Sequence, residues 1–252
     1  MKFKTRLNGI VAASAISGLL TVANHASAQL TQLHPSFYGS AELDTRNSQF
    51  YLPGVYVGVG GLGWSPYFNA NGYALRYQVL PQVSNTDQTL TALLPTLGLA
   101  YASRSNGVSF GAGYAFVNNE DPGAPGAEGG GTSGATASLG AYHSGRGARS
   151  MHTQLLANYN FDSRYVWARG RASVPFGASR SHPARLGAEV VGQGGGRDGI
   201  TSNTWQVGPT LEYVWSPMLR TTAAAGWKAV DGSRFTAREN AAYFKLEFSF
   251  SP

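Results

Sequence analysis

The chain has 252 residues, of which 33 are glycine, 13% are charged, 12% are aromatic and none is cysteine. This length suits one large domain or two small ones. The absence of cysteine excludes disulfide scaffolds, thiolate zinc sites and cysteine nucleophiles. The high aromatic and low charged content excludes a disordered chain, and no apolar run beyond the N-terminus is long enough for a membrane helix. Many glycines and few Glu and Lys residues favour an all-β protein.

The N-terminal segment has the pattern of a secretory signal peptide. Lys2, Lys4 and Arg6 precede a small, apolar stretch, and Ala26 and Ala28 are the small residues of a cleavage site. We therefore expect residues 1–28 to be removed and residues 29–252 to form one domain. That domain carries 16 Lys and Arg against 13 Asp and Glu, a net charge of +3. It contains no basic cluster, which argues against a nucleic-acid partner.

Beyond residue 28, apolar and polar residues alternate with a period of two, as in β-strands. Tyr243–Phe250 is one example, with phenylalanine and leucine opposite tyrosine, lysine, glutamate and serine. The pattern predicts about 12 strands, in the range 10–12, at Ser36–Asp44, Val55–Trp64, Gly72–Leu80, Ala92–Ala102, Val108–Val117, Ala135–His143, Met151–Phe161, Tyr165–Phe176, Arg185–Gln193, Thr204–Trp215, Leu219–Lys228 and Ala241–Phe250.

We expect the apolar face of these strands to contact lipid. The opposite face is mostly Gly, Ala, Ser, Thr, Gln and charged residues, which suits the lumen of a membrane barrel. Trp205 and Trp215 share one face, and at ~3.4 Å per residue and a tilt of ~40° they lie about 26 Å apart, near the spacing of two aromatic girdles. The predicted fold is an antiparallel up-and-down transmembrane β-barrel. Pro175 and Pro209 fall inside predicted strands, where each requires a bulge or a strand end.

The sequence offers little catalytic chemistry. His143 and Ser144 are adjacent and therefore point to opposite faces of a strand, which disfavours a serine–histidine pair. The other histidines are scattered, so no metal site is expected. Glu42 and Asp44 share a face but are better explained as wall charges than as a glycosidase pair. We expect no enzyme activity and no cofactor.

Charged residues on the polar faces are the candidate functional residues. They are Arg76, Arg169, Arg171, Arg185, Glu189 and Glu212, and they predict a mostly cationic lumen with a few carboxylates. Such a lumen selects anions or holds a saccharide, or it is filled by an ion-paired network that is purely structural. Counting back from the turn after Phe176 places Glu189 opposite Ala172, within diagonal reach of Arg171.

Part of the sequence resembles the BcsS-type outer-membrane proteins associated with bacterial cellulose biosynthesis. The resemblance lies in the strand Tyr165–Arg171 after a Phe-Asp turn, in the following Phe-Gly turn at Phe176, and in the Gly-Ala-Glu strand at Gly187–Glu189. It covers about the last 100 residues and implies an accessory role in exopolysaccharide export or assembly, with no catalytic residues. The general strand pattern also resembles the MipA/OmpV-type scaffold barrels. Tyr243–Phe250 is similar to the C-terminal insertion signature of outer-membrane barrels, although Ser251 and Pro252 follow it.

These observations predict a non-enzymatic barrel in the cell outer membrane, exported through the inner membrane. Its expected partners are outer-membrane lipid and, through the resemblance, a polysaccharide or proteins of a secretion machinery. A diffusion porin or small-solute channel and a scaffold barrel are the alternative functions.

Overall fold

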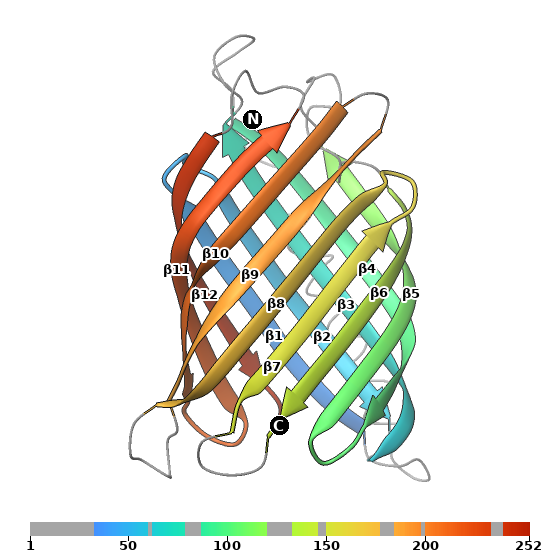
Figure 1. Ribbon diagram of the computed structural model, residues 1–252. Helices are drawn as coiled ribbons and strands as arrows, with labels where there is room; N and C mark the ends of the chain where they lie inside the picture. The colour runs from blue at the N-terminus through green and yellow to red at the C-terminus, as the bar shows by residue number, and fades with distance from the viewer. Residues whose placement is uncertain are drawn as a thin grey trace, which may run out of the picture.

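The computed structural model describes residues 33–59, 62–78, 87–119, 133–145, 150–176, 184–197, 200–232 and 239–252. These residues form one closed antiparallel β-barrel of 12 strands, which confirms the predicted fold class (Figure 1). The predicted signal peptide, residues 1–28, lies outside the described residues. Among the described residues, no helix has the length and apolar character needed to cross a membrane.

The strands follow one another around the barrel in chain order. They are β1 (Leu33–Asp44), β2 (Gln49–Val59), β3 (Gly63–Gln78), β4 (Asp87–Ala102), β5 (Asn106–Asn119), β6 (Gly134–Ser144), β7 (His152–Asn160), β8 (Tyr165–Phe176), β9 (Ala184–Arg197), β10 (Ile200–Val214), β11 (Leu219–Gly232) and β12 (Glu239–Phe250).

The pairing of β1 with β12 closes the barrel. Phe37 is opposite Phe250, and Asp44 is opposite Tyr243. Because β1 begins and β12 ends at the same end of the barrel, we call that end the lower mouth, as it is drawn in Figure 1. Asn119, where β5 ends, and Gly134, where β6 begins, lie at the opposite, upper end, whereas the short turns 103–105 and 215–218 lie at the lower mouth.

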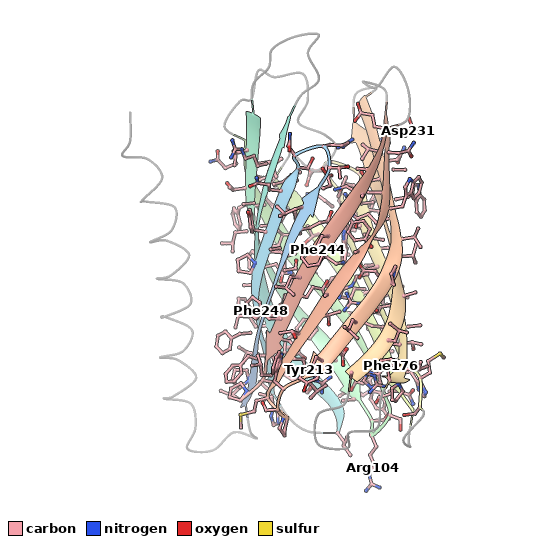
Figure 2. All side chains as sticks on the ribbon, turned by 90° about the vertical axis from the view of Figure 1, so that its left-hand side faces the viewer. Arg104, Phe176, Tyr213, Asp231, Phe244 and Phe248 are labelled. Carbon is pink, nitrogen blue, oxygen red and sulfur yellow. The ribbon has the colours of Figure 1, made fainter. Side chains whose placement is uncertain are left out.

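The outer face of the barrel is apolar and the inner face is polar. On β12, Phe244 and Phe248 are 52% and 51% exposed, whereas Tyr243 and Lys245, which alternate with them, are 3% and 5% exposed (Figure 2). Trp205 and Trp215 are both exposed on the outside, Trp205 within β10 and Trp215 directly after its last residue. An apolar exterior around a polar interior is the arrangement of a transmembrane barrel and the reverse of a soluble one.

The strand β3 begins well before its predicted start at Gly72. The segment 65–71 is predicted as a connection between two strands, but it belongs to β3. Asn69 and Asn71 from this segment face the lumen, where both accept hydrogen bonds from the Tyr38 hydroxyl. Polarity marks a loop in a soluble protein, but in a membrane barrel it also marks the inward face of a strand. The predicted loops at 194–203 and 229–240 are likewise shortened by β9, β10, β11 and β12.

Pro175 lies near a strand end and Pro209 lies at a local interruption of one ladder, so neither removes a donor from a continuous ladder. Pro175 is near the end of β8, beyond the last pair that β8 makes with β7. Pro209 is opposite Ala188 on β9, but the ladder between β10 and β11 skips Gly208 and Pro209 without changing register. The same two-residue interruption surrounds Pro53 and Pro95. No bulge is therefore needed at Pro209, because the unpaired step is absorbed within an otherwise continuous ladder.

Candidate functional site

The charged residues that face the lumen gather on one side of it. Among the described side chains, those of β2 to β7 that face inward include no Asp, Glu, Lys or Arg, whereas β8 to β12 and β1 carry a dozen. The lumen is thus divided lengthwise into a charged wall and a neutral wall. The charged wall contains two ion-pair networks.

The first network joins β8, β9 and β12. Arg171 Nη2 lies 2.7 Å from Glu189 Oε2 and 2.8 Å from Glu247 Oε2. Arg169 Nη1 lies 2.7 Å from Glu247 Oε1. Lys245 pairs with Glu189 and lies 3.3 Å from Glu247. Each carboxylate is therefore shared by at least two cations, which offsets much of the cost of removing these charges from water.

Neutral groups complete this network at its edges. Arg169 Nη2 donates a hydrogen bond to Gln154 Oε1 at 2.9 Å, and its guanidinium carbon lies 6.0 Å from the centre of the Trp167 ring. The Tyr243 hydroxyl donates to Glu189 Oε1 at 3.4 Å. These contacts hold the arginines and Glu189 in one geometry, because each planar guanidinium binds several acceptors at once.

The second network joins β1, β10 and β11. Lys228 Nζ lies 3.0 Å from both Glu42 Oε1 and Asp44 Oδ2, and Gln206 donates a hydrogen bond to Glu42. Above it, Arg46 follows Asp44 and binds Glu239 Oε2 at 2.6 Å. This network links the end of β1 to β10 and β11 on the inner face of the barrel.

The two networks together are balanced in charge. The cations are Arg169, Arg171, Lys228 and Lys245, and the carboxylates are Glu42, Asp44, Glu189 and Glu247. The predicted mostly cationic lumen is therefore wrong at this level of the barrel. Pairing is required here because Glu189 is only 2% exposed, and an isolated buried charge is very costly.

The neutral wall is built from tyrosines lying against glycines. The Tyr67 ring covers Gly98 and Gly111, where an added Cβ would clash with it. The Tyr56 and Tyr67 rings stack with centroids 5.2 Å apart. Nearby, the Tyr38 hydroxyl donates to Asn69 Oδ1 at 2.8 Å. Glycine on the inward face makes room for these rings, so that large side chains from β1 to β3 fill the interior.

The structure brings together three of the predicted lumen residues, Arg169, Arg171 and Glu189, in the first network. Arg171 is directly opposite Glu189 in the ladder, one position away from the predicted register. Two further predicted lumen residues, Arg185 and Glu212, are also opposite each other, but they lie at the lower mouth.

Arg76 does not belong to this group. It is exposed, and its ladder position puts it on the same face of β3 as Gly72 and Phe68, which are opposite the outward residues Leu93 and Leu97. The prediction that Arg76 lines the lumen therefore fails, because Tyr73 faces inward and packs against Phe50. On this strand the aromatic residues fill the barrel rather than face lipid.

Several network residues were absent from the predicted set. Lys228, Lys245, Glu247, Glu42 and Asp44 carry most of the contacts. The alternation of Lys245 and Glu247 with phenylalanines on the last strand was a usable signal, since it put both on the polar face. The alternation on the last strand does not indicate which strands face it from the other parts of the barrel wall.

The two histidines of β6 and β7 each have a polar side-chain partner at the lower mouth. His143 Nδ1 lies 2.6 Å from Asn106 Oδ1. Ser144 is directly opposite His152, and its hydroxyl is hydrogen-bonded to His152 Nε2. The partner of Ser144 is thus a histidine across the hairpin, which the sequence spacing did not indicate. Within the described part of the chain, no three His, Asp or Glu residues are arranged to hold a metal ion.

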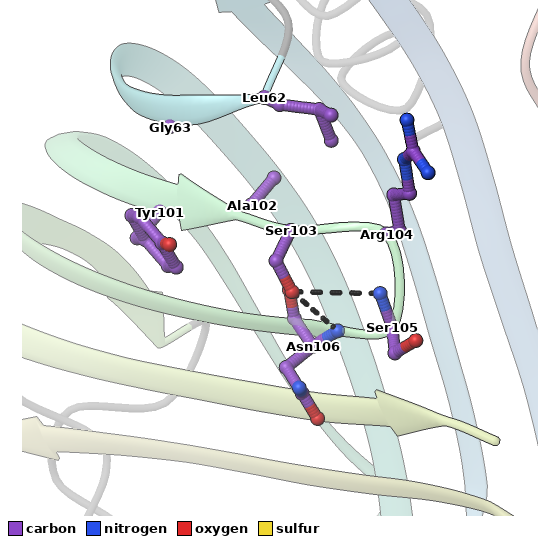
Figure 3. Close-up of a pocket in the computed structure, with 8 residues that line it drawn as sticks. All are labelled: Leu62, Gly63, Tyr101, Ala102, Ser103, Arg104, Ser105 and Asn106. Carbon is purple, nitrogen blue, oxygen red and sulfur yellow. Dashed lines mark hydrogen bonds between the residues drawn. The ribbon is translucent and has the colours of Figure 1, made fainter.

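A shallow cleft of about 460 Å³ lies outside the networks, where the turn between β4 and β5 meets the start of β3. Figure 3 shows Arg104 at the tip of that turn, and the Ser103 hydroxyl accepts hydrogen bonds from the amides of Ser105 and Asn106. Because the Ser103 hydroxyl is already bonded within the turn, the main charged group at the cleft is the exposed guanidinium of Arg104.

Comparison with known proteins finds similarity in structure only. No protein-family model and no curated protein matches the sequence. An outer-membrane channel from Pseudomonas putida F1 is 10% identical, with 89% of this chain and 97% of that chain covered and a TM-score of 0.49. The β domain of the Bordetella autotransporter BrkA is 10% identical (89% and 100% covered, TM-score 0.48), as is LpxR from Salmonella typhimurium (85% and 99% covered, TM-score 0.47). The resemblance to BcsS-type proteins therefore rests on the quoted residues alone.

Proposed function

We propose that this protein is a non-enzymatic barrel of the outer membrane that assists exopolysaccharide, cellulose-type, biosynthesis or export, with its lumen closed by side chains. The observation that carries the closed lumen is the burial of Glu189 inside a shared ion-pair network. A water-filled pore of the porin kind keeps its wall charges in contact with solvent, whereas these charges are satisfied by one another.

The geometry of the networks supports closure because they join strands that are not neighbours in the sheet. Arg169 on β8 reaches Glu247 on β12, four strands away around the barrel. Gln206 on β10 reaches Glu42 on β1, three strands away. Twelve strands enclose more space than the eight that side chains fill easily, so long residues such as arginine and tyrosine are needed to span it.

The apolar exterior and the predicted signal peptide support a location in the outer membrane after export through the inner membrane. In barrels with an even number of strands and longer outer loops, the lower mouth corresponds to the periplasmic side. Outer-membrane lipid is then the partner of the whole outer surface.

The role in polysaccharide handling is supported by the residues of the resemblance. Arg169, Arg171 and Glu189 belong to the resembling segments, and they also form the centre of the first network. On this proposal, the motif is the part of the chain that closes the barrel. The partner is a polysaccharide or a protein of its secretion machinery.

A small-solute channel is the second candidate, because the lower mouth carries arginines outside the balanced networks. Single-channel recording in planar bilayers distinguishes the two. The closed barrel should show no steady open steps, and open steps of porin size would contradict it. A scaffold barrel would also be silent in this assay.

Deleting the gene tests the polysaccharide role. We expect less cell-surface β-glucan, measured by dye binding, with recovery when the intact gene is returned. A version lacking residues 1–28 should not restore it. An unchanged amount of β-glucan in the deletion strain would contradict the role in export and leave the scaffold function.

A further inference from the structure

The lower mouth contains two arginines that lack the carboxylate partners found higher in the barrel. Arg185 begins the inward face of β9, and Arg220 does the same on β11. Among the described residues, neither lies within 4.0 Å of a carboxylate, unlike Arg169, Arg171 and Lys245 above them. The positive charge of this mouth is therefore not neutralised by ion pairs.

Glu212 lies between these two arginines without binding either. It is directly opposite Arg185 and, through Thr222, diagonal to Arg220. Its Oε1 atom is buried without a hydrogen-bond partner, and so is Arg185 Nε. An unsatisfied buried acceptor beside an unsatisfied buried donor costs free energy unless another molecule satisfies both.

Residues at the lower ends of β6 and β7 also belong to this part of the mouth. Arg185 Nη2 donates to the Ser150 carbonyl oxygen at 3.0 Å, which ties β9 to the turn between β6 and β7. His152, hydrogen-bonded to Ser144, lies close enough to Arg185, Arg220 and Glu212 to feel their charges. Five side chains from five strands thus converge, and we call Ser144, His152, Arg185, Glu212 and Arg220 the mouth site.

We propose that the mouth site binds a small oxyanion that also carries a hydroxyl group. Arg185 Nε and the Arg220 guanidinium would bind the charged oxygens, as guanidinium groups bind phosphate and carboxylate. The Glu212 carboxylate would accept the hydroxyl proton of the same ligand, a contact that repels an oxyanion without one. Monohydrogen phosphate and a sugar acid both have this chemistry. The site is separate from the two networks and does not depend on whether the barrel is an accessory protein or a channel.

Calorimetric titration of the full mature protein in detergent tests the proposal with four probes: inorganic phosphate, sulfate, glucuronate and glucose. Phosphate or glucuronate should bind at least tenfold more tightly than sulfate, which has no hydroxyl at neutral pH, and glucose should not bind. Tighter binding of phosphate points to a phosphate ligand, and tighter binding of glucuronate points to a sugar acid. If neither binds, the mouth site holds only water and the proposal is wrong.

Substitutions at the mouth site test whether the anion binds there. Arg185→Gln and Arg220→Gln should each weaken binding of the preferred anion about tenfold or more, because each removes a charge-assisted contact. Arg104→Gln is the matched control, since it removes the same charge from the same end of the barrel, where Figure 2 shows Arg104 projecting away from the wall. Glu212→Gln should tighten sulfate binding and abolish the preference for phosphate over sulfate.

Two outcomes would overturn the proposal. Binding that is unchanged in both arginine variants, or lowered equally by Arg104→Gln, would mean a non-specific charge effect. A preference for phosphate that survives Glu212→Gln would remove the role of that carboxylate. Because Arg220 is exposed, its variant is expected to fold, and heat-modifiable migration on a gel checks folding in every case.

Discussion

Arg171 and Glu189 face each other directly across β8 and β9, with Nη2 of the arginine 2.7 Å from Oε2 of the carboxylate. Each also has a second partner on β12, since Arg171 binds Glu247 and Glu189 binds Lys245. The pair is therefore part of a four-residue ring of alternating charge rather than an isolated contact, and removing one member leaves the others unbalanced.

Replacing Arg171 with alanine should destabilise the folded barrel by about 2–4 kcal/mol, because it leaves two buried carboxylates with fewer cations. Removing Arg171 and Glu189 together should cost less than the two single changes combined, since the double variant keeps the charge balance. Guanidinium unfolding in lipid vesicles measures both. Arg104→Ala is the control, and a double-variant cost equal to the sum of the two single-variant costs would contradict the ring.

The outward face of β10 should not tolerate charge. Val207→Arg or Leu211→Arg should cost ~2–4 kcal/mol if the residue meets lipid near the midplane, and less toward an interface. Both are exposed on the outside, whereas Thr210 is buried on the inside. Thr210→Ser should therefore be mild. Insertion into vesicles, followed by gel migration without heating, reports the difference, and equal tolerance at both faces would mean that this surface does not contact lipid.

Two glycines should respond differently to alanine. A Cβ at Gly208 would clash with the Ala225 carbonyl oxygen of the neighbouring strand, whereas a Cβ at Gly170 would meet only Val190 Cγ1 at 3.5 Å, an ordinary contact. Gly208→Ala should lower stability by more than 1 kcal/mol because backbone has to move, and Gly170→Ala should be close to neutral. Thermal loss of the compact gel form compares the two, and similar stability of both variants would argue against this close approach.

The mature protein should begin at Gln29. Ala26 and Ala28 provide the small residues that signal peptidase requires. N-terminal sequencing of protein purified from the outer membrane measures this directly, and replacing Ala28 with a bulky residue such as Trp should leave residues 1–28 attached. A purified protein that begins at Met1 would contradict both the signal peptide and the proposed export.

The sequence by itself determined the class of fold and most of the two faces. A period of two is a local property of a strand, so the exposed Phe244 and the buried Lys245 could be assigned without knowing any neighbour. The assignment failed at Arg76, where the large aromatic Tyr73 turns inward to fill space beside a glycine-rich wall. Which side of a strand meets lipid depends on what the interior needs for packing, and that is not a local property.

Only the tertiary structure decided which charges meet. Arg169 and Glu247 are 78 residues apart, and they form an ion pair because closure of the barrel brings β8 and β12 around the same lumen. A shift of one position in register separates the predicted neighbour of Glu189, Ala172, from the observed one, Arg171. Register is fixed by the whole ladder of hydrogen bonds and by the fit of side chains across the lumen, so the sequence of one strand does not contain it.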